Sequence, residues 1–80
     1  MSVYLAKEVN SQIPDMAFKN VQALKIFVKE IKSNHFDHSQ VHEIDIKDRK
    51  CKKARLGDSL EIYFYEKEDS TFILSVVEKR

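Results

Sequence analysis

The chain has 80 residues, of which 42% are hydrophobic and 34% are charged, and its formal net charge at pH 7 is +1. This composition excludes a disordered chain, which would be less hydrophobic and more highly charged, and the length suits one small domain. With so little net charge, attraction to a polyanion must come from local clusters of lysine and arginine.

Cys51 is the single cysteine of the chain, so an internal disulfide is impossible and packing alone must stabilise the fold. Residues 1–5 lack the basic start and long apolar run of a signal peptide, and no apolar stretch approaches the roughly 20 residues that cross a bilayer. We therefore expect a cytoplasmic protein that does not contact a membrane.

The first half of the chain predicts one strand and one long helix. Apolar residues alternate over Ser2–Val9, which favours a short strand, and residues 10–14 interrupt it. Asp15 is a suitable N-cap for a helix that ends at Ser33 and Asn34. The apolar residues of this helix recur at steps of three and four and form one stripe, which consists of Ala17, Val21, Leu24, Phe27, Val28 and Ile31.

Alternating apolar and polar residues in the second half predict four strands. Their ranges are 41–47, 52–56, 60–65 and 72–76. Gly57 and Asp58 form the turn between the second and third of them. The predicted fold is α+β, with one long helix packed on a four- to five-stranded antiparallel sheet in the order β-α-β-β-β-β. The strand residues expected in the core are Ile44, Ile62, Phe64, Phe72, Leu74 and Val76.

A dense basic segment precedes the Gly-Asp turn. Its candidate nucleic-acid-binding residues are Arg49, Lys50, Lys52, Lys53 and Arg55. In a strand, Arg49, Lys53 and Arg55 share one side, at a spacing that suits consecutive phosphates. The alternative is a solvated edge strand whose lysines prevent aggregation. The sequence leaves both interpretations open.

The last two strands carry apolar residues on their second face as well. These residues are Tyr63, Tyr65, Ile73 and Val77, and they predict a face that is either half covered by the rest of the chain or used to contact a partner. Tyrosines on such a face can stack on bases or anchor a protein, but they also stabilise ordinary hairpins as cross-strand pairs.

The histidines and the cysteine give no strong motif. His35, His38 and His42 lack the second cysteine or carboxylate pair that would complete a tetrahedral site, so no metal or cofactor is predicted. His42, beside the basic segment, is a candidate for proton transfer near neutral pH. Neighbouring cations favour the Cys51 thiolate, but no partner for nucleophilic catalysis is apparent, and a small, partly buried thiol is the default.

Residues 52–80 contain a basic strand, the turn Arg55-Leu56-Gly57-Asp58, the strand Leu60–Tyr65, an acidic turn and a last apolar strand that ends in Lys79-Arg80. This order resembles the C-terminal half of the RelE/ParE family of bacterial toxins. The chain departs from the family in Ser59 and Leu60, where an aromatic residue and then an arginine are usual. Its first half also has room for one long helix where the family commonly has a helical hairpin.

The resemblance implies a partner and an activity. Ribosome-dependent members of the family cleave messenger RNA without a metal, and a cognate antitoxin inhibits them. Carried over to this sequence, Arg55 would contact phosphate and Lys79 and Arg80 would be the terminal basic pair, so that these residues and His42 are the catalytic candidates. The sequence therefore supports a protein that engages RNA or the ribosome, with or without endoribonuclease activity. A phage- or plasmid-encoded regulator or inhibitor that binds another protein is the alternative.

Overall fold

The computed structural model describes residues 2–79. Its elements are β1 (Ser2–Leu5), α1 (Lys7–Gln12), the 3₁₀ helix η1 (Ile13–Asp15), α2 (Phe18–Lys32), the 3₁₀ helix η2 (His38–Gln40), β2 (Val41–Ile46), β3 (Arg49–Leu56), β4 (Leu60–Lys67) and β5 (Ser70–Glu78). The chain is α+β, as the sequence predicts. No helix within residues 2–79 is both long enough and apolar enough to span a membrane.

The strands form one five-stranded sheet in the order β1-β5-β4-β3-β2. β2 to β5 pair antiparallel with their sequence neighbours, whereas β1 runs parallel to β5. The predicted antiparallel sheet is therefore wrong at one edge, and the sheet is mixed. Side chains alternate in the same way in parallel and antiparallel strands, so the sequence pattern carried no information on the direction of β1.

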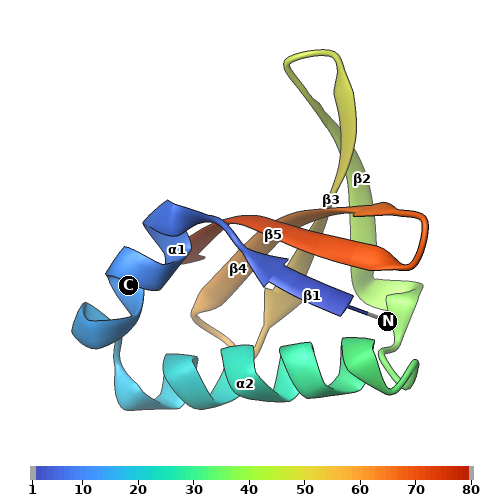
Figure 1. Ribbon diagram of the computed structural model, residues 1–80. Coiled ribbons are helices and arrows are strands. Elements are labelled where there is room, and N and C mark those ends of the chain that lie inside the picture. Colours follow the sequence, from blue (N-terminus) through green and yellow to red (C-terminus); the bar gives the residue numbers. More distant parts are fainter. Residues whose placement is uncertain (1, 80) are drawn as a thin grey trace.

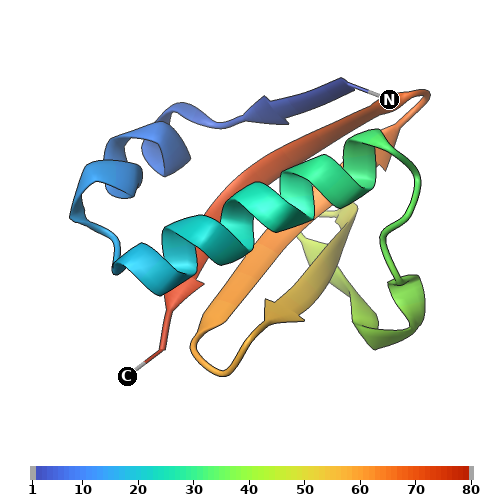
Figure 2. The same ribbon diagram turned by 90° about the horizontal axis from the view of Figure 1, so that it is seen from below.

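Helix α2 lies across one face of the sheet, which we call the helix face, while α1 lies at one end of the sheet (Figures 1 and 2). Within the part of the chain that the structure describes, no helix covers the opposite face, which we call the open face. The β2–β3 hairpin extends beyond the sheet on the side away from α2 (Figure 1). The open face is therefore a sheet surface with the hairpin rising beside it.

The single long helix that the sequence predicts is wrong. The six-residue helix α1 and η1 precede α2, which has 15 residues and begins only at Phe18. Pro14 lies in the first turn of η1, a position where the missing N–H is harmless. β1 ends at Leu5, and Val9, expected in that strand, is instead fully buried on α1. Asp15 lies in η1 and does not cap α2, whose N-cap is Ala17.

The core lies between α2 and the helix face. It comprises Val9, Leu24, Phe27, Ile31, Ala54, Leu60, Ile62, Phe64, Ile73 and Val76. The Phe27 ring contacts the rings of Phe36 and Phe64 edge to face, with centroids 4.8 and 5.2 Å away, a favourable geometry for buried aromatic pairs. Ile44, which the sequence places in the core, is only half-buried and lies outside this cluster.

A β-bulge between β4 and β5 changes which residues of β5 enter the core. Ile62 pairs with Val76 and Phe64 pairs with Ile73, which leaves one extra residue in β5, Leu74. A bulge shifts the alternation of side chains by one position. Val76 is therefore buried as predicted, but Ile73 takes the core position expected of Phe72 and Leu74, both of which are half-buried.

The turn of the β2–β3 hairpin consists of two residues, Lys47 and Asp48, with φ of 49° and 64°. Two left-handed residues between paired strands make the tight turn that suits the twist of a hairpin. β3 consequently begins at Arg49, three residues before the predicted Lys52. The longer strand brings Arg49 into the sheet.

Candidate nucleic-acid interface

The register of β3 divides the basic segment between the two faces of the sheet. Lys52 pairs with Phe64, a core residue, and so lies on the helix face, whereas Lys53 pairs with Tyr63 on the open face. By the alternation of the strand, Arg49 and Arg55 share the open face with Lys53. Three of the five predicted nucleic-acid-binding residues are thus brought together.

The remaining two do not join them. Lys52 donates to the Glu66 carboxylate with an Nζ–Oε1 distance of 2.6 Å, and both side chains are partly buried. Lys50 pairs in register with Asp45 on β2. Both lysines therefore lie on the helix face, away from Arg49, Lys53 and Arg55.

A buried carboxylate organises the cations of the open face. Glu61 is 8% exposed, and its Oε1 lies 3.2 Å from Lys79 Nζ while its Oε2 lies 3.7 Å from Lys53 Nζ. Arg55 pairs with Glu61 in register. We call Lys53, Arg55, Glu61 and Lys79 the cation cluster.

A hydrogen bond from Lys79 lowers the pKa of Glu61, and the charges of Lys79, Lys53 and Arg55 act in the same direction, whereas burial opposes them. Glu61 therefore remains a carboxylate at neutral pH and holds the ammonium groups in place. Sequence reasoning missed Glu61. Pairing the predicted strands on either side of Gly57 would have placed it opposite Arg55.

His42 lies beside the cation cluster, since it pairs with Lys53 in register and is exposed. The structure thus places three of the predicted catalytic candidates, His42, Arg55 and Lys79, on the same face of the sheet. Arg80, the fourth candidate, lies outside the described residues. These side chains come from β2, β3 and the residue that follows β5.

The other histidines lie outside the strands, and Cys51, which by the alternation of β3 shares the open face with Arg49 and Lys53, is buried. His35 is exposed in a loop, and His38 Nε2 lies 3.7 Å from Glu66, which bonds Lys52 on the helix face. Cys51 is 1% exposed, so its thiol is shielded from solvent. Among residues 2–79, no group of three or more histidine, cysteine or acidic side chains is placed to hold a metal ion.

A row of aromatic rings crosses the open face from β1 to β4. The rings of Tyr4 and Phe72 are 5.2 Å apart at 18°, and those of Phe72 and Tyr65 are 4.9 Å apart at 15°. The Arg49 guanidinium carbon lies 4.8 Å from the centre of the Tyr65 ring, which is within the range of a cation–π contact. We call Tyr4, Phe72, Tyr65 and Arg49 the aromatic row. Sequence reasoning missed Tyr4 and Phe72 because it detected neither the parallel strand nor the bulge.

The predicted partner-contacting residues divide between surface and core. Tyr63 and Tyr65 are half-buried and Val77 is 38% exposed, so their side chains are accessible in part. Ile73 is fully buried within the core. The prediction that Ile73 contacts a partner is therefore wrong, and the cause is again the bulge, which turns Phe72 outward in its place.

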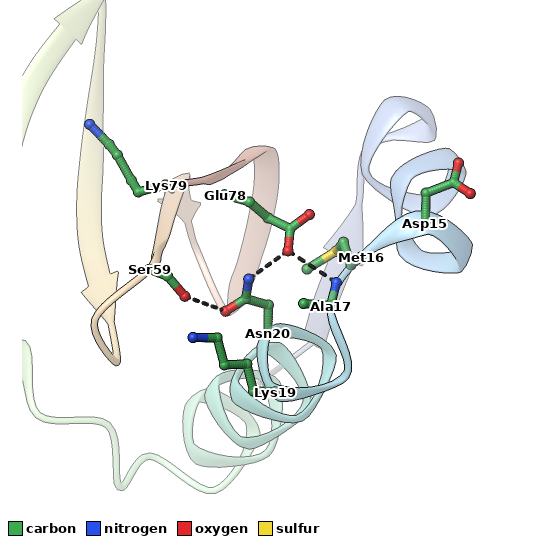
Figure 3. A pocket seen from close by; sticks show the side chains of 8 residues that line it. All are labelled: Asp15, Met16, Ala17, Lys19, Asn20, Ser59, Glu78 and Lys79. Atoms are coloured by element: carbon green, nitrogen blue, oxygen red, sulfur yellow. Dashed lines mark hydrogen bonds between the residues drawn. The ribbon is translucent and has the colours of Figure 1, made fainter.

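A cavity of about 580 Å³ lies elsewhere, where the start of α2 meets the end of β5 (Figure 3). Glu78 accepts hydrogen bonds from the Ala17 N–H at 3.1 Å and the Asn20 amide at 2.5 Å, and Ser59 donates to Asn20 at 3.0 Å. The side chain of Lys79 points away from these groups (Figure 3). This network fastens α2 to the sheet and has the properties of a structural contact.

Comparison with protein-family models finds no match, and comparison with curated protein sequences finds none either. Among solved structures, the chain is similar to the solution structure of the conserved hypothetical protein HP0894 from Helicobacter pylori. The two share 13% sequence identity with a TM-score of 0.62, over 98% of this chain and 93% of the other. At this level of identity the similarity shows a shared fold.

Proposed function

We propose that the protein binds single-stranded RNA, free or on the ribosome, through its open face, and that it cleaves the RNA at the cation cluster as a RelE/ParE-like toxin. The partner of such a toxin would be a cognate antitoxin. The observation that carries the proposal is the separation of charge between the two faces of the sheet.

On the open face, the described strand residues include Arg49, Lys53, Arg55 and Lys67, and Lys79 joins them after β5. Glu61 is the only carboxylate among the described strand residues of that face. The other strand carboxylates, which are Glu43, Asp45, Glu66 and Glu78, occupy helix-face positions. Although the net charge of the chain is only +1, the strand residues of the open face therefore carry an excess of positive charge that can attract a polyanion.

Two features of the chain bear on the family resemblance. The first half of the chain contains two α-helices, α1 and α2, with η1 between them, so their number matches the helical hairpin that is common in RelE/ParE proteins. Leu60, however, is fully buried in the core, and the Ser59 hydroxyl is bonded to Asn20. In this chain, cleavage would therefore depend on other residues than the arginine that the family usually has after the Gly-Asp turn.

The side chains beside Glu61 suit cleavage of RNA by its own 2′-hydroxyl. In the proposed reaction, His42 accepts the proton of the 2′-hydroxyl as the 2′-oxygen forms a bond to phosphorus. Lys53 and Arg55 stabilise the negative charge on the phosphate oxygens. The bond from phosphorus to the 5′-oxygen breaks, and that oxygen takes a proton from Lys79. The products are a 2′,3′-cyclic phosphate and a 5′-hydroxyl.

The alternative is a non-catalytic regulator or inhibitor that binds a protein. The partial exposure of Tyr63 and Val77 on the open face favours it. Binding of a protein through this patch would depend little on salt, whereas binding of RNA would weaken steeply as salt rises.

The test is the salt dependence of RNA binding. We would measure affinity for a fluorescent single-stranded RNA by anisotropy over a range of salt, for the parent and for Lys53→Gln with Arg55→Gln. Each phosphate contact contributes about 0.7 to the slope of log affinity against log salt for single strands, so the slope should fall by about 1.4.

The matched control is Lys19→Gln with Lys25→Gln, which removes two exposed lysines from α2 on the other side of the sheet. This control should bind RNA like the parent. A parent that binds neither RNA nor ribosomes, or a control that loses as much affinity as the open-face variant, would overturn the proposal.

A further inference from the structure

One end of the aromatic row is covered by a side chain of the protein, and the ring at the other end is exposed to solvent. At its β3 end, Arg49 lies over the ring of Tyr65. At its other end, Tyr4 stands on β1, the edge strand of the sheet, and stacks on Phe72 through one ring face. Tyr4 is 52% exposed, because no strand of the described chain lies beyond β1.

We propose that the outer ring face of Tyr4 is a binding site for an unpaired nucleobase, so that a base continues the row of stacked rings. This inference rests on the proposed binding of RNA to the open face. It adds a second point of attachment, based on stacking, to the cation cluster, based on charge.

The stacking of Tyr4 on Phe72 already orders the Tyr4 ring before a base binds. Contact with Phe72 holds the Tyr4 ring at a small angle to its neighbour, so little side-chain freedom remains to be lost on binding. A flat ring of this kind accepts any base, since every base has a π-face. Tyr4 would therefore add affinity with little sequence preference.

The position of Tyr4 relative to the cation cluster fits one continuous strand of RNA. β1 and β4 are separated only by β5, and Glu61 lies four residues before Tyr65 along β4. Two strand spacings and four residues correspond to roughly 16 Å across the face. A few nucleotides of single-stranded RNA would bridge that distance, with phosphates at the cation cluster and a base on Tyr4.

The test uses an oligouridylate that carries 2-aminopurine at one position, and the same oligonucleotide with an abasic residue at that position. The chain has no tryptophan, so the fluorescence of 2-aminopurine can be excited without a tryptophan background. Stacking on Tyr4 should quench this fluorescence in the parent at the position that reaches β1. The abasic oligonucleotide should bind the parent about 5- to 100-fold more weakly.

Tyr4→Ala should bind the 2-aminopurine oligonucleotide about 5- to 100-fold more weakly than the parent. Tyr4→Phe keeps the ring and should bind within about twofold of the parent, as a change that preserves stacking should. The matched control is Phe18→Ala, which removes a 77% exposed aromatic ring from α2, and it should also bind like the parent. Urea melts would show that each variant is folded.

The outcomes separate this inference from the proposed function. If the parent binds RNA and the Lys53→Gln, Arg55→Gln variant does not, while Tyr4→Ala binds like the parent, the stacking site is wrong and the proposed function stands. If the parent shows no preference for the 2-aminopurine oligonucleotide over the abasic one, the site is also wrong, whatever the variants do. A parent that binds no RNA overturns both.

Discussion

Gly57 lies in the turn between β3 and β4 with φ of +61°, a conformation that costs residues with a Cβ atom about 1–2 kcal/mol. A Cβ atom added at Gly57 would meet no atom within 4 Å. The loss of stability in Gly57→Val should therefore come from backbone strain alone.

We expect Gly57→Val to lower the free energy of unfolding by about 1–2 kcal/mol in urea melts. Gly57→Asn should lose less, because asparagine tolerates the left-handed conformation better. Equal stability of the valine variant and the parent would show that the turn has a different backbone conformation.

Glu61 predicts a dependence of stability on pH. Because its folded-state pKa is lowered from 4.5, mainly by the hydrogen bond from Lys79, the ionised carboxylate stabilises the folded state. This contribution is complete above the unfolded-state value and is lost as the pH falls through the lowered folded-state pKa.

Glu61→Gln removes that titration. The parent should therefore lose more stability than Glu61→Gln when urea melts at neutral pH are compared with melts well below pH 4.5. Asp45→Asn is the control, since Asp45 is exposed on β2. Identical pH profiles for the parent and Glu61→Gln would contradict the proposed role of the carboxylate.

At the scale of elements, the core-facing residues of the helix α2 were predictable from the sequence, and those of the last strand, β5, were not. Leu24, Phe27 and Ile31 are buried, as their spacing predicts, because a helix has one period from end to end. In β5 the bulge interrupts the period of two, so the alternation read from the sequence assigned Phe72 and Ile73 to the wrong faces. An extra residue in a strand has no reliable signature in a single sequence.

Deletion of the extra residue in the bulge tests the register between β4 and β5. Deletion of Leu74 would leave Ile73 paired with Phe64 and Val76 paired with Ile62, now in regular alternation. The core contacts would be kept, so we expect the shortened chain to fold, with some loss of stability from the half-buried leucine.

Deletion of Tyr63 from β4 is the contrasting variant. It would shift the β4 residues on one side of the deletion by one position, so that their core side chains would turn toward the open face. A sheet with one buried face does not tolerate such a shift. Cooperative urea melts should be seen for the Leu74 deletion and not for the Tyr63 deletion. The reverse result would mean that the register of β4 and β5 is wrong.

At the scale of the whole molecule, the candidate site depends on which strands lie side by side. Lys53 and Arg55 were found as a basic segment of the sequence, and the alternation of β3 places them on one face. Glu61, Lys79 and Tyr4 join that face only through pairing across the sheet. A net charge of +1 gave no indication of the separation of charge, because net charge does not depend on which face each residue occupies.

The last prediction separates RNA cleavage from RNA binding. In the proposed reaction His42 only moves a proton, whereas Lys53 and Arg55 hold phosphate, so His42→Ala should bind single-stranded RNA within about twofold of the parent and cleave it about 10²- to 10⁴-fold more slowly. The measurement is the rate at which labelled RNA, free or on ribosomes, yields fragments with a 2′,3′-cyclic phosphate.

The proposed chemistry uses side chains alone, so cleavage should continue at an unchanged rate when a chelator removes divalent cations from free RNA. His35→Ala is the matched control, since His35 is exposed in the loop after α2 and lies apart from the cation cluster. Equal loss of cleavage in both histidine variants would mean that His42 has no special role. If the parent binds RNA but cleaves it neither free nor on ribosomes, the proton transfer assigned to His42 does not occur. The open face would then serve RNA recognition alone.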